Sequence, residues 1–441
     1  MRLFNFILFL GGFRPLKNAK EVRRLNGMST QEFRSYEKFK REEIFNFHKS
    51  RNRFYKTFLD DKTVDSWNDI PTLSKIDYRQ AGDLILSQGF KKSEVKTGST
   101  SGSSGTPLRY YKDKQMHGLT WQAIKFRFDN LGLNLGEKQA RFYGIPKGRF
   151  KYRIERIKDI LLNRYRFVVF DMSDEAMEVF IQKFRKTDFK YIYGYTNSLV
   201  LFAKYLISKN KVLKRDYCNS LKCCIVTAEQ CTDNDLRILE LALGVRVINE
   251  YGSSEVDVIA FTDNAGNWRI SNELVYVEIL DEKNQALPDG EVGKIVVTHL
   301  HNRAMPIIRY EVGDLGSIER DQKGRCDVLV KLSGRLNDFA ILPSGKRVPG
   351  FTMYYAAKEI VGDIDTISEY QIRQISRSEF LILVVCSEEL NQNQVVKIQD
   401  LMGNYLEPNL KISVERVLYI DREKSGKFKH FIALSDVDSG K

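Results

Sequence analysis

Between residues 115 and 300, segments with helical periodicity alternate with short apolar runs typical of buried strands. The helical segments are 174–186, 197–208 and 232–243, and the strand-like runs are 221–226, 245–249, 274–280 and 293–299. Because helices and strands that alternate along a chain pack as layers against a sheet, we expect an α/β fold of mixed α+β character.

The chain has 441 residues, more than one ordinary domain of about 100–200 residues, and its pattern changes near residue 334. Beyond that point we predict a compact unit with strands at 371–375, 380–385 and 412–418 and helices at 351–361 and 391–405. The polar segment 334–338 contains a glycine about which the chain can swivel. We therefore predict a large N-terminal domain at 1–333, a hinge at 334–338 and a small mobile C-terminal lid at 339–441.

Lysines and arginines give the chain a net charge of +13, spread widely but densest at 141–166. Ile154, Ile157 and Leu161 recur there at helical spacing, which predicts a basic amphipathic helix near 150–162. Such a helix can meet an anionic membrane or an acidic ligand, but an ordinary surface helix with a solvated charged face is the favoured interpretation. No nucleic-acid-binding motif accompanies the charge, so we expect no nucleic-acid partner.

The cysteines and the N-terminal segment bear on the cellular compartment. The six cysteines lack paired C-x-x-C knuckles, which favours free buried thiols in a reducing cytoplasm over a zinc site. Residues 3–12 are apolar but too short for a membrane span, which takes about 20 residues. No small-x-small cleavage site follows them. We expect a cytoplasmic protein, with peripheral contact at the inner membrane face as a further option.

A loop rich in glycine and hydroxyl side chains occupies residues 96–107. Its glycines allow tight turns, and its backbone N–H groups and hydroxyls can wrap phosphates. It is no Walker loop, because Gly105 is followed by Thr106 and Pro107, and its glycines lack the Rossmann spacing. From the loop alone, a flexible linker is equally well supported.

Three later motifs favour the phosphate interpretation. The Tyr-Gly-Ser-Ser-Glu segment 251–255 follows a predicted strand, where an aromatic ring can stack on a purine and a carboxylate can ligate Mg²⁺. Asp314 ends the segment 309–314, and an aspartate there can accept both hydroxyls of a ribose. Lys427 lies beside a glycine, where it can reach into a cleft as a point charge. Separately, these segments also fit a surface turn, a backbone cap and a basic tail.

In this order, the four motifs resemble those of the adenylate-forming superfamily of acyl-CoA synthetases, adenylation domains and luciferases. Tyr-Gly-x-x-Glu followed by Arg-Tyr-x-x-Gly-Asp resembles the phenylacetate–CoA ligase branch, which includes CapK-like capsule proteins. The segments 67–75, 194–199 and 227–229 resemble the same branch, so the resemblance covers nearly the whole chain.

The resemblance implies a two-step reaction, in which a carboxylate attacks the α-phosphate of ATP and an acceptor, usually the thiol of CoA, then displaces AMP. It implies ATP-binding roles for Thr100, Ser101, Gly102, Ser103, Ser104, Gly105, Tyr251, Gly252, Ser253, Asp314 and Arg335. Glu255 would hold Mg²⁺, Lys427 would stabilise charge on the α-phosphate, and Asp338 would be the hinge.

The substrates are less sharply specified. Tyr193, Tyr195, Thr227 and Glu229 are candidates to line the acyl pocket. Thr106 stands where many members have lysine, and no clear CoA signature is present, so two acceptors stay open. The leading prediction is transfer to CoA, and the alternative is transfer to an amine or sugar in polysaccharide synthesis. A non-catalytic nucleotide-binding scaffold is the alternative of another class, and a homodimer is an option.

Overall fold

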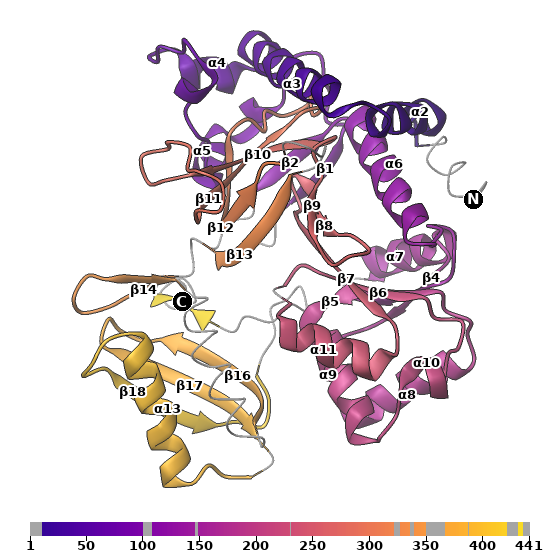
Figure 1. The fold of residues 1–441 in the computed structure, drawn as a ribbon, viewed down its shortest axis with the longest axis vertical. Coiled ribbons are helices and arrows are strands. Elements are labelled where there is room, and N and C mark those ends of the chain that lie inside the picture. Colours follow the sequence, from indigo (N-terminus) through magenta and orange to yellow (C-terminus); the bar gives the residue numbers. More distant parts are fainter. Residues whose placement is uncertain are drawn as a thin grey trace. The chain divides into compact units, whose positions relative to one another are not determined.

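The computed structural model describes residues 11–99, 108–145, 149–229, 231–321, 327–335, 339–349, 367–386, 388–420 and 431–434 (Figure 1). The chain divides into two compact units, which are described separately. The first contains most residues up to Val330, and the second consists chiefly of the residues from Lys331 onward. Residues 351–361, one of the two helices predicted for the C-terminal domain, lie outside the described residues.

Helices begin the first unit. They are α2 (Pro15–Asn26), α3 (Thr30–Arg51), α4 (Arg53–Leu59) and α5 (Lys75–Ala81), with short 3-10 turns at Trp67–Asp69 and Gly82–Ile85. Ser74 caps α5, because its hydroxyl accepts from the backbone N–H of Asp77 and the Asp77 carboxylate accepts from that of Ser74. This reciprocal cap fixes where α5 begins.

An eleven-stranded sheet forms the body of the first unit, in the order β10-β11-β12-β13-β9-β8-β7-β6-β5-β3-β4. The strands are β3 (Gln139–Phe142), β4 (Arg164–Phe167), β5 (Tyr191–Tyr195), β6 (Cys223–Thr227), β7 (Arg246–Ser253), β8 (Asp257–Thr262), β9 (Trp268–Ile270), β10 (Val275–Leu280), β11 (Gly293–His299), β12 (Tyr310–Glu319) and β13 (Val328–Arg335). Strands β4, β3, β5, β6 and β7 are parallel, and β7 to β9 are antiparallel. The parallel half therefore presents its carboxyl ends at one edge.

Helices cover both faces of the parallel half. They are α6 (Lys114–Asn130), α7 (Arg149–Leu161), α8 (Asp174–Arg185), α9 (Thr196–Ser208), α10 (Leu213–Asp216) and α11 (Asp233–Leu243). Alternate residues of β5 and β6 serve two cores: Ile192 and Cys224 pack toward α8, α9 and α11, whereas Tyr191 and Cys223 pack toward α6. This period-2 burial on both sides explains the continuous apolar runs in the sequence.

A hairpin of β1 (Lys96–Ser99) and β2 (Arg109–Lys112) brackets the Gly/Ser loop. The loop itself, 100–107, lies outside the described residues. Lys96 pairs with Lys112 and Gly98 with Tyr110 across the hairpin. A Cβ atom at Gly98 would lie 2.3 Å from the Tyr110 ring, so a larger residue there would force that ring to move.

The second unit contains a four-stranded sheet in the order β18-β17-β16-β19. Its elements are β14 (Phe339–Ile341), β15 (Arg347–Pro349), β16 (Ile367–Gln374), β17 (Glu379–Cys386), α13 (Gln392–Tyr405), β18 (Lys411–Arg416) and β19 (Phe431–Ile432). Ile398 and Met402 of α13 are buried in a core that includes Ile372 and Ile382 of the sheet. The mixed α/β character predicted from the sequence is confirmed in both units.

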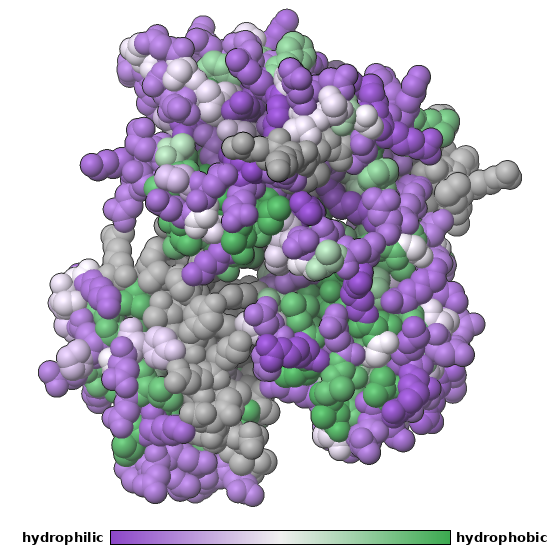
Figure 2. Space-filling model, viewed as in Figure 1, coloured by the Kyte–Doolittle hydropathy of each residue, from purple (hydrophilic) through white to green (hydrophobic). Residues whose placement is uncertain are grey.

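Among the described residues on the face shown in Figure 2, hydrophilic side chains predominate and hydrophobic ones gather in separate patches. No helix in the described part of the chain is long and apolar enough to cross a bilayer.

Candidate functional site

Glu255 lies in the turn between β7 and β8, with a side chain that is only 2% exposed. Its Oε1 accepts a 2.6 Å hydrogen bond from the hydroxyl of Tyr310, the first residue of β12. The Lys75 ammonium, at the start of α5, lies 3.7 Å from the same oxygen. Three elements far apart in the sequence therefore meet at one buried carboxylate, which is flanked by the Tyr310 hydroxyl and the Lys75 ammonium.

The backbone beside Glu255 is bent. The pairing of β7 with β8 shifts register between Tyr251 and Gly252, and the two strands approach closely there. A Cβ atom at Gly252 would lie 2.2 Å from the carbonyl oxygen of Asp257, which excludes any larger residue. Ser253 closes the turn, because its hydroxyl accepts from the backbone N–H of Val256 at 3.2 Å. Bulges of this kind re-aim side chains at the ends of strands.

A row of polar side chains crosses the carboxyl ends of the parallel strands. Tyr195, Thr227 and Glu250 are aligned by the registers of β5, β6 and β7. Glu250 accepts from the Tyr193 hydroxyl at 2.6 Å and from the Thr227 hydroxyl at 3.4 Å. Burial raises the pKa of the Glu250 carboxyl, and these two hydrogen bonds oppose the rise.

Aromatic rings and one guanidinium group extend this row. The Tyr143 ring lies 4.2 Å from that of Tyr195 and stacks on Tyr193 at 5.8 Å, centroid to centroid. The Arg141 guanidinium lies 4.0 Å from the centre of the Tyr143 ring. Such a surface offers flat apolar area and hydrogen-bonding groups together, as ligand pockets do.

The predicted pocket residue Glu229 has a defined place. Its carboxylate accepts from the backbone N–H of Asn197 at 2.8 Å, and its carbonyl accepts from the Thr196 hydroxyl. Both partners begin α9, where a negative charge is stabilised by the helix dipole. The preceding residue, Ala228, has a φ of 71°, a region that non-glycine residues seldom occupy. Glu229 thus anchors a strained turn to a helix, and its contact with a substrate stays a prediction.

A charged cluster supports the hairpin. Buried Lys112 forms an ion pair with Asp257, and the Lys96 ammonium lies 2.9 Å from Nε2 of His117. The neighbouring Lys112 lowers the pKa of the Asp257 carboxyl. Burial of the Lys96 ammonium group lowers the pKa of Lys96 to about 8. These contacts tie β1, β2 and α6 to the turn that carries Glu255.

The structure describes some of the other predicted site residues and leaves the rest outside the described ranges. Tyr251 is buried on β7, and Asp314 is half-buried on β12, four positions after Tyr310. Arg335 is the last residue of β13. The loop residues Thr100–Gly105, Asp338 and Lys427 lie outside the described residues, so their roles stay predictions.

The donor set at Glu255 fits a magnesium ion that is held jointly with phosphates. Mg²⁺ in nucleotide sites takes one or two protein carboxylates and completes its shell with water and phosphate oxygens. Oε1 of Glu255 is occupied by Tyr310, whereas Oε2 is the second oxygen of a buried carboxylate. Within the described ranges, no group of three or more His, Cys, Asp or Glu side chains could hold a metal alone.

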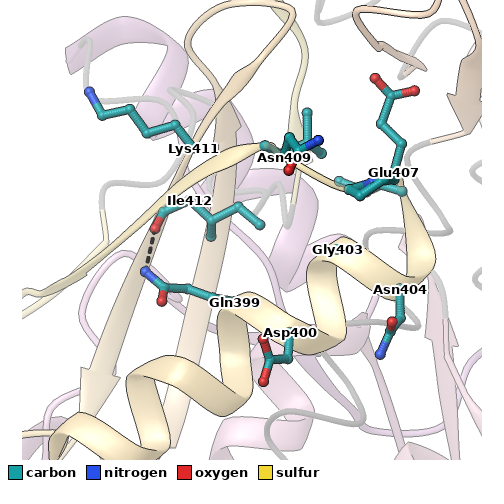
Figure 3. Close-up of a pocket in the computed structure, with 11 residues that line it drawn as sticks. Gln399, Asp400, Gly403, Asn404, Glu407, Asn409, Lys411 and Ile412 are labelled. Carbon is teal, nitrogen blue, oxygen red and sulfur yellow. Dashed lines mark hydrogen bonds between the residues drawn. The ribbon is translucent and has the colours of Figure 1, made fainter.

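A separate pocket of about 960 Å³ lies in the second unit between α13 and β18 (Figure 3). Gln399 closes its base by donating to the carbonyl of Ile412 at 2.8 Å. Glu407 and Lys411 point in different directions, so their charges do not converge on one centre. None of the predicted site residues lines it.

Sequence reasoning missed several of these residues. Lys75 and Tyr310 lie in the segments 67–75 and 309–314, but the motifs assign them no role. The motifs also do not include Glu250, Arg141 or Tyr143. The signal for Glu250 was an acidic residue inside an apolar strand, directly before the Tyr251 motif. The signal for Tyr310 was absent, because only the sheet brings β12 against the β7–β8 turn.

Comparisons with known proteins agree with this geometry. Residues 343–433 match the family model for the CapK C-terminal domain. The chain is 23% identical over 398 residues to Protein CapK of Staphylococcus aureus, covering 87% of this chain and 84% of that protein. A local match of 126 residues, 31% identical, links it to phenylacetate-coenzyme A ligase of Pseudomonas putida and covers 27% of this chain and 28% of the ligase.

Solved structures show the same architecture. A 2-hydroxyisobutyryl-CoA ligase in the postadenylation state superposes with a TM-score of 0.68 at 16% identity, covering 92% of this chain and 90% of the ligase. An amide bond synthetase, McbA from Marinactinospora thermotolerans, superposes with a TM-score of 0.53 at 16% identity, covering 80% of this chain and 70% of the synthetase.

The chain therefore has the fold of the adenylate-forming superfamily, as its motifs predicted. Within that class, residues 343–433 match the CapK C-terminal domain, and the chain is similar to Protein CapK along most of its length.

Proposed function

We propose that this chain activates a carboxylic acid with ATP as an acyl-adenylate and then transfers the acyl group. A carboxylate oxygen of the acid attacks the α-phosphorus of ATP, and pyrophosphate leaves with the electron pair of the broken P–O bond. The observation that carries the proposal is the buried Glu255 carboxylate, which follows β7 and accepts a hydrogen bond from Tyr310 of β12. It occurs in a chain with the fold described above. No activated protein nucleophile is required, because the substrate carboxylate fills that role.

Each predicted residue has a defined part in this proposal. Glu255 would ligate Mg²⁺, which supplies charge neutralisation to the phosphates. Tyr251 would stack on the adenine and Asp314 would accept the ribose hydroxyls, with Arg335 near them. The loop from Thr100 to Gly105 would wrap the phosphates, and Lys427 would stabilise charge on the α-phosphate. Asp338 would be the pivot of a mobile lid between the two steps.

The acyl group would lie against the polar row at the strand ends. Tyr193 and Glu250 offer a hydrogen-bonded pair, and the Tyr143 and Tyr195 rings offer flat apolar surface. A planar or aromatic acid with a hydrogen-bonding substituent matches this combination.

CoA is the proposed acceptor, whose thiol would attack the acyl carbonyl and release AMP. An amine or sugar acceptor is the second candidate. The match to Protein CapK favours it, because that match spans 87% of the chain whereas the match to a phenylacetate-coenzyme A ligase spans 27%. An amine acceptor is also supported by the likeness in fold to a protein described as an amide bond synthetase.

Pyrophosphate release from ATP and Mg²⁺ across a panel of carboxylic acids tests the proposal. We expect release with at least one acid, and a loss of about 100-fold or more in Lys427→Ala and Glu255→Gln. Lys424→Ala is the matched control, because it removes a lysine from the same segment without changing Lys427. CoA, amines and amino sugars added to the active mixture then identify the acceptor. Tight ATP binding without release for any acid would favour a nucleotide-binding scaffold instead.

A further inference from the structure

Helix α7 packs with its acidic side inward, which is the reverse of an ordinary surface helix. It lies beside the edge strand β4 (Figure 1). Asp159 is 3% exposed and accepts from Nε of Arg164 at 2.5 Å and from Nε of Arg166 at 3.0 Å. Glu155 accepts from Nη2 of Arg166 at 2.7 Å. The helix is thus attached to the sheet by ion pairs and hydrogen bonds along its acidic face.

The apolar side chains of α7 face solvent as a consequence. Phe150 is 76% exposed, Ile157 is 56%, Ile160 is 78% and Leu161 is 46%. At about 100° per residue, these four side chains fall within an arc of about 100° on one side of the helix. We call them the α7 apolar face. Exposed apolar side chains that gather on one side of a helix, rather than scattered single residues, mark an interaction surface.

Positive charge surrounds this apolar face. Arg153 is exposed and lies within the same arc, between Ile160 and Ile157 in helical projection. Arg156 packs its guanidinium 5.1 Å from the centre of the Tyr152 ring on one border. Lys158 is exposed on the other border and pairs with Glu155 of the same helix. Because the acidic residues are turned inward, the outward side combines apolar and cationic groups.

We propose that α7 is a membrane-docking surface, which lies in the interface of a bilayer that contains anionic lipid. The apolar face would enter the boundary between headgroups and acyl chains, and the arginines and lysine would meet the headgroup phosphates. Charge complementarity selects this occupant over a second copy of the chain, because two such faces would bring their cations together. The inference does not depend on the proposed catalytic function.

The test is cosedimentation of the full chain with vesicles of phosphatidylcholine alone and of phosphatidylcholine mixed with phosphatidylglycerol. We expect binding to the mixed vesicles, weakened at least tenfold by raised salt and much weaker on phosphatidylcholine alone. The double variant Ile157→Asp/Ile160→Asp should lose at least tenfold in binding, and Arg153→Glu should weaken binding without abolishing it.

Val179→Asp is the matched control, because Val179 is 64% exposed on α8, outside the α7 apolar face. It should bind vesicles as the unchanged chain does, and circular dichroism should show all variants folded. The proposal is overturned if the unchanged chain ignores anionic vesicles or if Ile157→Asp/Ile160→Asp binds them normally. It is also overturned if the unchanged chain is a dimer that this double variant converts to a monomer without any vesicle binding.

Discussion

The hydroxyl of Tyr310 donates a 2.6 Å hydrogen bond to Glu255, a residue 55 positions earlier in the chain, and both side chains are buried. The bond engages one carboxylate oxygen, Oε1, and so fixes the orientation of the group. Positioning of this kind matters in phosphoryl chemistry, where catalysis depends mainly on the placement of charge.

Replacing Tyr310 with phenylalanine tests this positioning. The buried Glu255 carboxylate would lose its neutral donor, so we expect a loss of about 1–3 kcal/mol in the free energy of unfolding. Pyrophosphate release should fall about tenfold or more, with a higher Mg²⁺ requirement. Tyr78→Phe is the control, because the Tyr78 hydroxyl donates to the carbonyl of Pro306 and its ring packs edge-on against Tyr310. Equal activity in the two variants would contradict the assignment.

Glu250→Gln and Tyr193→Phe test whether the polar row at the strand ends selects the acid. For whichever acid the pyrophosphate assay identifies, we expect KM to rise about tenfold while kcat changes little, because binding of the acyl group is what is lost. The measurement is steady-state kinetics with that acid and with a close analogue. Glu240→Gln, on the exposed side of α11, should leave KM unchanged. A fall in kcat without a change in KM would assign Glu250 to another step.

Two glycine substitutions should have opposite effects on stability. In Gly252→Ala, the added Cβ would lie 2.2 Å from the carbonyl oxygen of Asp257, so the strands must separate at the site. We expect a loss of about 2 kcal/mol or more. In Gly403→Ala, the Cβ would meet nothing within 4 Å on helix α13, and a gain of about 0.5–1 kcal/mol is expected. Thermal unfolding measures both, and an unchanged melting temperature in Gly252→Ala would refute the clash.

Buried histidines should make the first unit sensitive to acid. Burial lowers the pKa of His48 to about 4 and that of His299 to about 3, from an ordinary value of 6.5. Near pH 6.5 the unfolded chain begins to bind these protons and the folded chain does not. The free energy of unfolding is therefore not reduced by these histidines above that pH. Between pH 6.5 and 4 it should fall by about 1.4 kcal/mol per pH unit for each histidine.

Urea unfolding followed by tryptophan fluorescence measures this dependence, because Trp67, Trp121 and Trp268 all lie in the first unit. His48→Gln should be less stable at neutral pH, since the His48 ring hydrogen-bonds the carbonyl of Asn302. Its free energy of unfolding should also depend less steeply on pH, because unfolding then takes up about one proton fewer. A slope identical to that of the unchanged chain would show that His48 does not contribute.

Much of the fold could be predicted from the sequence because local patterns carry it. The helices at 174–186, 197–208 and 232–243 and the strands around Cys223 and Ile295 lie where periodicity placed them. The predicted C-terminal strands and the helix at 391–405 are also present. Each of these elements has a period of 3.6 or 2 residues, or a continuous apolar run, which neighbouring residues alone determine.

Helix α7 shows where local patterns stop. Its sequence predicts an amphipathic helix, and the helix is present. The favoured interpretation, a solvated charged face, does not determine which side of the helix meets the sheet. Arg164 and Arg166 on β4 decide it, because they draw Asp159 and Glu155 inward and leave the apolar side chains outside.

The sequence by itself determined the elements, the order of the motifs and hence the superfamily, because spacing and local periodicity are properties of neighbouring residues. Only the tertiary structure decided that Tyr310 bonds Glu255, that Tyr193 bonds Glu250 and that α7 faces outward on its apolar side. The first two are pairings between residues more than fifty positions apart, and the order in which strands join the sheet brings them together. The third depends on ion pairs between α7 and the strand beside it, which the helical periodicity of the segment does not reveal.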